Sequence, residues 1–170
     1  ALTIFSPSFD RHLVKKFTSL NTLIILDIGF YKGSFSKSLI TKVLRDNNNI
    51  KIKLHSFDPN IKIDLNNFKK FTNINKVAWE HRDFAIGDKF QKENFTILNA
   101  FPSSGSSIKN ILEDSLWYRT RKFLIDPFGN NSNKTSNIEV TVETIDRLFR
   151  LDQHIDLIKI DVEGYSLEVL

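Results

Sequence analysis

The sequence predicts an α/β fold in which a mostly parallel sheet carries helices on both faces. First, the mostly apolar residues 23–28 lead through a glycine-containing turn into a helical pattern, the order of a strand followed by a crossover helix. Second, apolar and polar residues alternate over residues 51–57, as they do in a strand. Third, residues 155–164 form a near-continuous apolar run, which a parallel strand covered on both faces requires.

The length and composition indicate a single domain. A chain of 170 residues with 41% apolar and 26% charged residues can form one globular core but hardly two. We therefore expect one domain over residues 1–170, with residues 1–21 as an N-terminal helical lead-in. The chain holds no methionine, begins at Ala1 and ends at Leu170 inside a predicted helix. These features suggest a truncated segment whose C-terminal strands are missing.

The charge and the absence of cysteine exclude several classes of function. The net charge of +4 is spread over interleaved acids and lysines, without a run of about five like charges, so nucleic-acid binding is not indicated. The chain has no apolar stretch of about 18 residues and no signal-peptide pattern at its start, so no membrane contact is expected. Zero cysteine excludes disulfides and thiolate metal sites and fits a reducing compartment. We expect a cytoplasmic protein.

The first strand ends in the motif Leu26-Asp27-Ile28-Gly29, and Gly33 follows before a predicted helix over residues 35–45. Glycines allow the backbone to approach a ligand closely, while the carboxylate accepts hydrogen bonds from it. In a dinucleotide-binding turn the place of Asp27 is normally glycine, because pyrophosphate needs N–H donors and repels a carboxylate. Asp27 therefore favours a cationic or hydroxyl-bearing ligand such as S-adenosylmethionine. An ordinary strand-to-helix turn is the other interpretation.

The second strand ends in the motif Phe57-Asp58-Pro59. Asp58 lies 58 − 27 = 31 residues beyond Asp27, more than the offset of about 20 residues that is usual for a ribose-binding acid. The intervening helix is long enough to account for the difference. A carboxylate at this strand end can accept both ribose hydroxyls, whereas the plain alternative is that Asp58 only starts a turn.

The central part of the chain predicts a shorter helix over residues 65–71 and a third strand that ends near residues 83–88. Small residues at that end would leave room for a flat ring, and Ala85 and Ile86 could form the wall of an adenine site. An apolar strand end before a turn is the more common meaning of such a pattern. A further strand is predicted over residues 95–98.

Residues 108–137 are predicted to form an inserted helix and a polar loop, after a serine-rich loop over residues 101–107. The insert could act as a lid over a substrate, or its aromatic helix could simply pack into the core. A strand over residues 138–142 and a short helix capped by Thr144 follow.

The last predicted strand carries three charges among apolar residues. Lys159, Asp161 and Glu163 share one side if the strand continues to residue 163. Such charges are costly to bury unless they pair or take part in function. An ion pair of Lys159 with Asp27 or Asp161 is the structural explanation. The functional explanation places Asp161 at the carboxyl end of a central strand, where open α/β sheets bind ligands.

The chain resembles the FkbM-type S-adenosylmethionine-dependent methyltransferases from about residue 23 to its end. The matching pieces are Leu26-Asp27-Ile28-Gly29 with Gly33 and Ser36, Phe57-Asp58-Pro59, Ala85-Ile86-Gly87-Asp88, Ser106-Ser107-Ile108, Val142-Glu143-Thr144-Ile145-Asp146 and, most specific, Lys159-Ile160-Asp161-Val162-Glu163-Gly164. The resemblance implies a Rossmann-like class I methyltransferase sandwich. Members of this family mainly methylate hydroxyl oxygens of sugars, polyketides and other small molecules.

The resemblance also assigns cofactor contacts. Carried over residue by residue, the cofactor-binding residues are Asp27, Gly29, Tyr31 and Gly33 in the turn, Asp58 at the ribose, and Ala85 with Ile86 near adenine. Phe30 and Tyr31 stand where the family usually has a small residue and Asn, which allows the amino-acid end of the cofactor to be held differently. Asp58 replaces the more usual Glu and keeps the ribose role.

Methyl transfer to oxygen requires an aligned acceptor and removal of its proton. Asp161 is the candidate general base or acceptor-orienting residue, and Glu163 is second. A carboxylate needs burial or a shared divalent cation to activate an alcohol, but two acids do not define a metal site, and we predict none. His55, His81 and His154 are alternative bases.

The leading hypothesis is an O-methyltransferase that uses S-adenosylmethionine on a hydroxyl of a sugar, glycan or other small molecule. An alternative is a catalytically degenerate module that keeps the cofactor fold. A nicotinamide-dependent oxidoreductase is the least favoured, because of Asp27 at the glycine turn.

Overall fold

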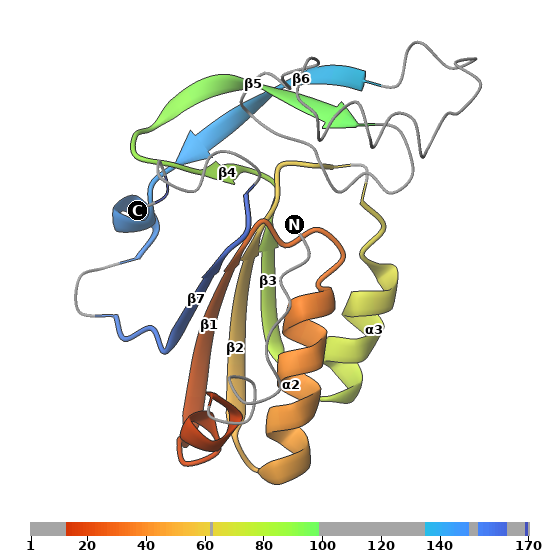
Figure 1. The fold of residues 1–170 in the computed structure, drawn as a ribbon, viewed down its shortest axis with the longest axis vertical. Coiled ribbons are helices and arrows are strands. Elements are labelled where there is room, and N and C mark those ends of the chain that lie inside the picture. Colours follow the sequence, from red (N-terminus) through yellow and green to blue (C-terminus); the bar gives the residue numbers. More distant parts are fainter. Residues whose placement is uncertain (1–12, 62, 99–134, 150–152, 163–168, 170) are drawn as a thin grey trace, which may run out of the picture.

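The computed structural model describes residues 13–61, 63–98, 135–149, 153–162 and 169 (Figure 1). Residues 13–17 of the expected N-terminal lead-in are helical, and residues 1–12 lie outside the described part. Most of the expected insert, residues 108–134, also lies outside it.

The central sheet has four parallel strands. They are β1 (Thr22–Ile28), β2 (Lys51–Phe57), β3 (Ala78–Arg82) and β7 (Leu157–Ile160). Their order is β3-β2-β1-β7, and every neighbouring pair is parallel. The mostly parallel sheet predicted from the sequence is confirmed.

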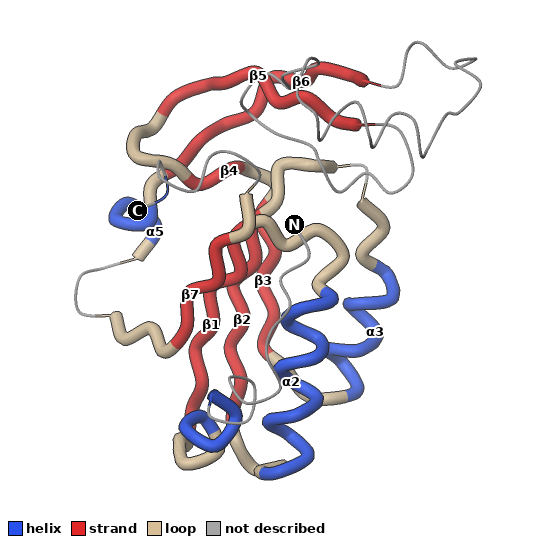
Figure 2. The backbone as a smooth tube through the Cα atoms, in the orientation of Figure 1, coloured by secondary structure: helices blue, strands red, loops and turns tan. Residues whose placement is uncertain are grey.

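One face of this sheet packs against α2 (Ser34–Asp46) and α3 (Asn66–Ile74), as the tube in Figure 2 shows. Side chains alternate across a strand, so Leu23 and Ile25 of β1 point toward α2 and enter one apolar core. The helical spacing of Leu39 and Val43 gives α2 the matching apolar stripe. Burial of these side chains against the sheet supplies much of the driving force for this layer.

The opposite face carries a second core. Leu26, Ile28 and Phe57, which alternate with the residues of the first core, pack there with Phe149 and Val169. The short helix α5 (Ile145–Leu148) adds partly buried side chains to this core. Thr144 caps α5, since its hydroxyl accepts a hydrogen bond from the backbone N–H of Arg147, which confirms the predicted cap.

A second sheet contains β4 (Ala85–Ile86), β5 (Gln91–Leu98) and β6 (Thr135–Glu143) in the order β4-β6-β5. Strand β4 is parallel to β6, and β5 is antiparallel to it. Figure 1 shows this sheet above the carboxyl ends of the central strands. Residues 135–137, assigned from the sequence to the insert, form the first part of β6.

The third strand expected to end near residues 83–88 is observed as β3, and residues 85–86 form a separate strand, β4. Strand β3 leaves the central sheet at Arg82, and after Asp83 and Phe84 the chain joins the second sheet. Ala85 pairs there with Val142, a partner that is distant in sequence. Such a long-range pairing leaves no trace in the local alternation of side chains.

Candidate active site

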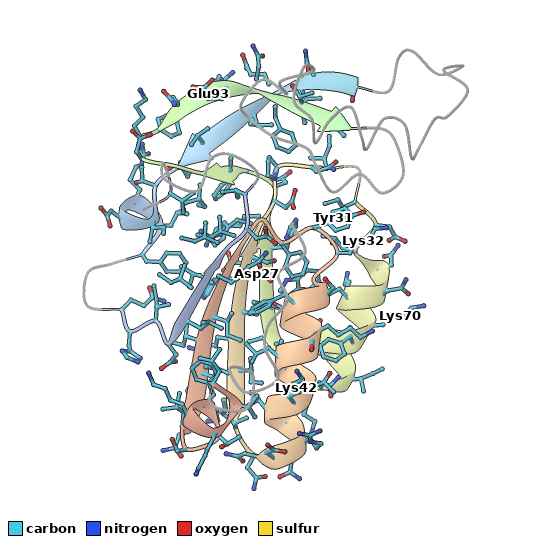
Figure 3. All side chains as sticks on the ribbon, in the orientation of Figure 1. Asp27, Tyr31, Lys32, Lys42, Lys70 and Glu93 are labelled. Atoms are coloured by element: carbon cyan, nitrogen blue, oxygen red, sulfur yellow. The ribbon has the colours of Figure 1, made fainter. Side chains whose placement is uncertain are left out.

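The candidate site lies where β1, β2 and β7 end. Parallel strands present their carboxyl ends at one edge of the sheet, and this edge carries Asp27, Asp58 and Asp161. Figure 3 shows Asp27 at the upper end of β1, with Tyr31 and Lys32 in the loop that follows. The three carboxylates have different surroundings.

Asp27 is wholly buried, with none of its surface exposed. Its Oδ2 accepts a hydrogen bond of 2.6 Å from the Ser36 hydroxyl, and its Oδ1 lies 3.0 Å from the Lys159 ammonium. Burial raises the pKa of Asp27, while the Lys159 charge and the Ser36 hydrogen bond act against the rise. The ion pair with Lys159, the structural explanation of the sequence pattern, is confirmed. The Asp27 carboxylate therefore faces protein atoms and not the surface.

At both glycines of the turn, neighbouring protein atoms occupy the space that a side chain would need. Gly29 has φ +76°, and a Cβ on it would overlap the backbone carbonyl of Asp161. Gly33 has φ +70°, and a Cβ there would overlap the rings of Phe30 and Phe68. Both positions need glycine for close packing within the protein and for their left-handed backbone. The sequence had suggested close approach of a ligand at these two positions.

Most backbone N–H groups of this turn are engaged within the protein. Gly29 and Phe30 both donate to the carbonyl of Phe57, at 3.0 and 3.1 Å. Tyr31 donates to Asp58 Oδ2 at 2.7 Å, and Gly33 donates to the carbonyl of Phe30 at 2.9 Å. A pyrophosphate binds at such a turn through free N–H donors, and here four of them are already used. This turn does not suit a dinucleotide.

Asp58 is 8% exposed and is fixed by backbone donors. Its Oδ2 accepts from Tyr31 N, and its Oδ1 accepts from Asn60 N at 2.9 Å. Burial raises the pKa of Asp58, and these two hydrogen bonds act against the rise. Each carboxylate oxygen can accept more than one hydrogen bond, so both keep acceptor capacity for a pair of neighbouring hydroxyls.

Asp161 is the most exposed of the three carboxylates, with 46% of its side chain open to solvent. Its backbone N–H donates to the carbonyl of Ile28 at 2.9 Å, which anchors it just beyond the last pair of β1 and β7. Its Oδ2 lies 3.6 Å from the Lys159 ammonium. A carboxylate placed in this way can meet a cationic ligand or a hydroxyl. Glu163 lies outside the described residues.

Ala85 and Ile86, the residues assigned to adenine from the sequence, are 7% and 2% exposed. They form β4, and Ile86 packs in the second core with Ile28 and Phe57. In this arrangement their side chains contact the protein interior. A role at adenine is therefore not visible in their contacts.

The three histidines considered as bases each have a protein partner. His55 Nδ1 lies 3.1 Å from Glu80, and His81 Nδ1 lies 2.9 Å from the Ser56 hydroxyl. His154 Nε2 lies 2.8 Å from Asp156, before the start of β7. Burial lowers the pKa of both His55 and His81.

Sequence reasoning missed the contact between Lys159 and the turn. The Lys159 ammonium donates a hydrogen bond of 2.7 Å to the Gly29 carbonyl. The charges of the last strand suggested an ion pair of Lys159 with Asp27 or Asp161, but not a hydrogen bond to a backbone carbonyl of the turn. The parallel register of Asp27 with Lys159 is what brings the ammonium to the turn.

Two further properties concern only the described part of the chain. No group of three metal-ligating side chains is found there. None of its helices has the length and apolar character needed to cross a membrane.

Comparison with known proteins gives one result. No curated protein and no solved structure matches the chain significantly. Residues 27–170 match the family model of the methyltransferase FkbM domain, a stretch that includes all three strand-end carboxylates. Because this match covers most of the chain, and the fold has the parallel sheet that the resemblance implied, the chain belongs to the FkbM methyltransferase family.

Proposed function

We propose that this methyltransferase uses S-adenosylmethionine to methylate a hydroxyl group of a sugar, glycan or other small molecule. The observation that carries the proposal is the set of acids at the strand ends. Asp27 is neutralised internally by Lys159, whereas Asp58 and Asp161 keep acceptor capacity at the edge where α/β sheets bind ligands. These carboxylate acceptors suit a cofactor that carries positive charge and a ribose diol.

Asp58 is the residue that would hold the ribose. Its carboxylate is fixed by Tyr31 N and Asn60 N, so little side-chain freedom is lost when it binds two hydroxyls. S-adenosylmethionine, when bound, supplies an already activated methyl group on its sulfonium. The protein therefore has to align the acceptor oxygen and accept its proton.

Asp161 would orient the acceptor hydroxyl. A carboxylate with 46% of its side chain exposed is a weak base toward an alcohol, so hydrogen bonding to the hydroxyl is its main role, with proton acceptance late in the reaction. Glu163 remains the second candidate for this step. A cytoplasmic location, and the absence of nucleic acid and membrane among its partners, belong to the same proposal.

Calorimetric titration of S-adenosylhomocysteine tests the cofactor site. We compare the wild type with Asp58→Asn, which keeps the side-chain shape and one acceptor oxygen but removes the charge. Asp64→Asn is the matched control, because exposed Asp64 also accepts a backbone N–H from two residues further on. Charged hydrogen bonds contribute about 1.5–3 kcal/mol, so Asp58→Asn should weaken binding by about tenfold or more.

The outcomes separate the hypotheses. Micromolar binding that is weakened in Asp58→Asn and unchanged in Asp64→Asn supports the cofactor site. Methyl transfer to any member of a panel of sugars and hydroxylated metabolites supports the enzyme, whereas binding without turnover on that panel favours the degenerate module. A folded wild type that binds no S-adenosylhomocysteine contradicts the proposal, and binding of a nicotinamide dinucleotide would then favour the oxidoreductase.

A further inference from the structure

Lys159 joins three acceptors at the end of the central sheet. The side chain is 13% exposed, and its Nζ lies 2.7 Å from the Gly29 carbonyl, 3.0 Å from Asp27 Oδ1 and 3.6 Å from Asp161 Oδ2. An ammonium has three N–H groups and no acceptor capacity. The Gly29 contact is a hydrogen bond, the Asp27 contact is a close ion pair, and the Asp161 contact is too long for a hydrogen bond, so protein atoms surround an ammonium that has little contact with water.

These three acceptors come from two chain segments. Asp27 and Gly29 lie at the end of β1, and Asp161 follows the end of β7. The ladder between the two strands ends at the pair Ile28 and Ile160. Beyond it, Asp161 N still donates to the Ile28 carbonyl, and Gly29 packs directly against the Asp161 carbonyl. The Lys159 side chain therefore crosses the seam at the point where regular strand pairing has stopped.

Neutralising the charge of Asp27 does not by itself explain the three contacts of the Lys159 ammonium. Neutralising a buried carboxylate requires only one cation within ion-pair distance. The shortest of the three contacts is instead the hydrogen bond to the Gly29 carbonyl, which lies in the turn that follows β1. The ammonium also approaches the exposed carboxylate of Asp161, which the proposed function places at the acceptor.

We propose that Lys159 is a positioning residue of the cofactor and acceptor site, a proposal that rests on the proposed function. Its ammonium holds the turn at Gly29 and orients the Asp161 carboxylate, in addition to neutralising Asp27. Because the groups nearest to its ammonium are the Gly29 carbonyl and the carboxylates of Asp27 and Asp161, it acts through these residues.

The test separates positioning from charge compensation. Lys159→Met alone leaves Asp27 buried and unpaired, so it is expected to destabilise the fold. The pair Asp27→Asn/Lys159→Met removes both charges with little change of volume, and neutral replacements of buried ion pairs are often tolerated. Lys92→Met is the matched control, since Lys92 forms an ion pair of 2.6 Å with Glu139 on the exposed surface of the second sheet.

We expect the pair variant to keep a thermal midpoint near that of the wild type but to bind S-adenosylhomocysteine about tenfold or more weakly, while Lys92→Met binds like the wild type. If the pair variant binds S-adenosylhomocysteine with wild-type affinity, the inference is overturned.

Hydrogen exchange distinguishes failure of this inference from failure of the proposed function. The amides of Gly29, Phe30 and Asp161 are hydrogen bonded across the strand ends. Their hydrogen exchange should become faster in the pair variant, while the amides of α2 keep their protection. If the wild type binds no S-adenosylhomocysteine, this measurement alone decides: faster exchange at the strand ends supports positioning by Lys159, and unchanged exchange overturns it.

Discussion

Tyr31 adopts a backbone conformation that its side chain disfavours. Its φ is +51°, in the left-handed region where residues other than glycine are uncommon, at a cost of about 1 kcal/mol or more. The strain is held because Tyr31 N donates to Asp58 Oδ2, one of the two hydrogen bonds that orient the carboxylate. The family resemblance noted above has Asn at this place, and Asn tolerates this conformation well.

Replacing Tyr31 by Asn should therefore raise the free energy of unfolding by about 0.5–1 kcal/mol, since the backbone strain falls and the N–H to Asp58 remains. Urea denaturation measures the change. Tyr31→Ala loses the same ring but has no preference for positive φ, so it is the control. An Asn variant no more stable than the Ala variant would show that backbone conformation is not the cause.

Gly29→Ala should be severely destabilising. The added Cβ meets the Asp161 carbonyl in a turn with φ +76°, so strand β7 or the turn must shift, at a cost of about 3 kcal/mol. Thermal unfolding followed by circular dichroism measures the loss. Lys32→Ala, an exposed position of the same turn, is the control. If Gly29→Ala unfolds at the wild-type midpoint, the close approach of these two segments is wrong.

Helix α3 ends in a Schellman motif with an unfavourable residue. Lys76 N donates to the Asn73 carbonyl and Val77 N donates to the Thr72 carbonyl, the two hydrogen bonds that define this ending. Lys76 takes the left-handed position with φ +53°, where glycine is the usual residue. Val77 is buried and fixes the direction in which the chain continues into β3.

The same substitution should have opposite effects at two positions of α3. Lys76→Gly should stabilise the protein by about 1 kcal/mol because it removes the strain at the helix end. Lys70→Gly, on the exposed side of the helix interior in Figure 3, should destabilise it by about 1 kcal/mol because glycine is a poor helix former. Urea denaturation of both variants gives the two signs, and equal signs would contradict the assignment of the helix end.

Element boundaries were predictable where local chemistry sets them. The helix expected over residues 35–45 is observed as Ser34–Asp46, because its apolar stripe is regular and the extended backbone of Asn47 ends it. The charges of the last central strand share one side up to residue 163 only if the strand continues that far, and β7 ends at Ile160. The alternation of side chains does not by itself show where pairing with β1 stops.

At the scale of the whole molecule, a half-buried histidine makes stability depend on pH. Burial is the main cause that lowers the pKa of His81 from its ordinary value of 6.5, and Asp83 acts against it. The imidazole lies beside Phe30 and Trp79, and its Nδ1 meets the Ser56 hydroxyl, which accepts from the Trp79 indole. Between the lowered pKa and 6.5 the unfolded chain binds more protons than the folded one, so stability falls as the pH drops below 6.5.

Lowering the pH from 7 to 5 should therefore reduce the free energy of unfolding less in His81→Asn than in the wild type. Denaturation at both pH values measures the difference, with His154→Asn as the control for loss of an imidazole from the surface. Asp27 and Asp58 have raised pKa values in the folded protein, so both favour the folded state more as the pH falls toward 3.8. Both variant and wild type contain them, so the comparison between the two proteins removes their effect. An equal reduction of the free energy of unfolding in both proteins would contradict a lowered pKa of His81.

The sequence by itself determined the strand–turn–helix units, the α/β class and the acids at the strand ends, because these depend on local periodicity and on residues adjacent in the chain. Tertiary structure decided what those residues do. The register of β7 against β1 buries Asp27 beside Lys159 and leaves Asp161 exposed. The switch of sheets after Arg82 buries Ala85 and Ile86. Both outcomes follow from pairing between residues far apart in sequence, whose energy no local pattern records.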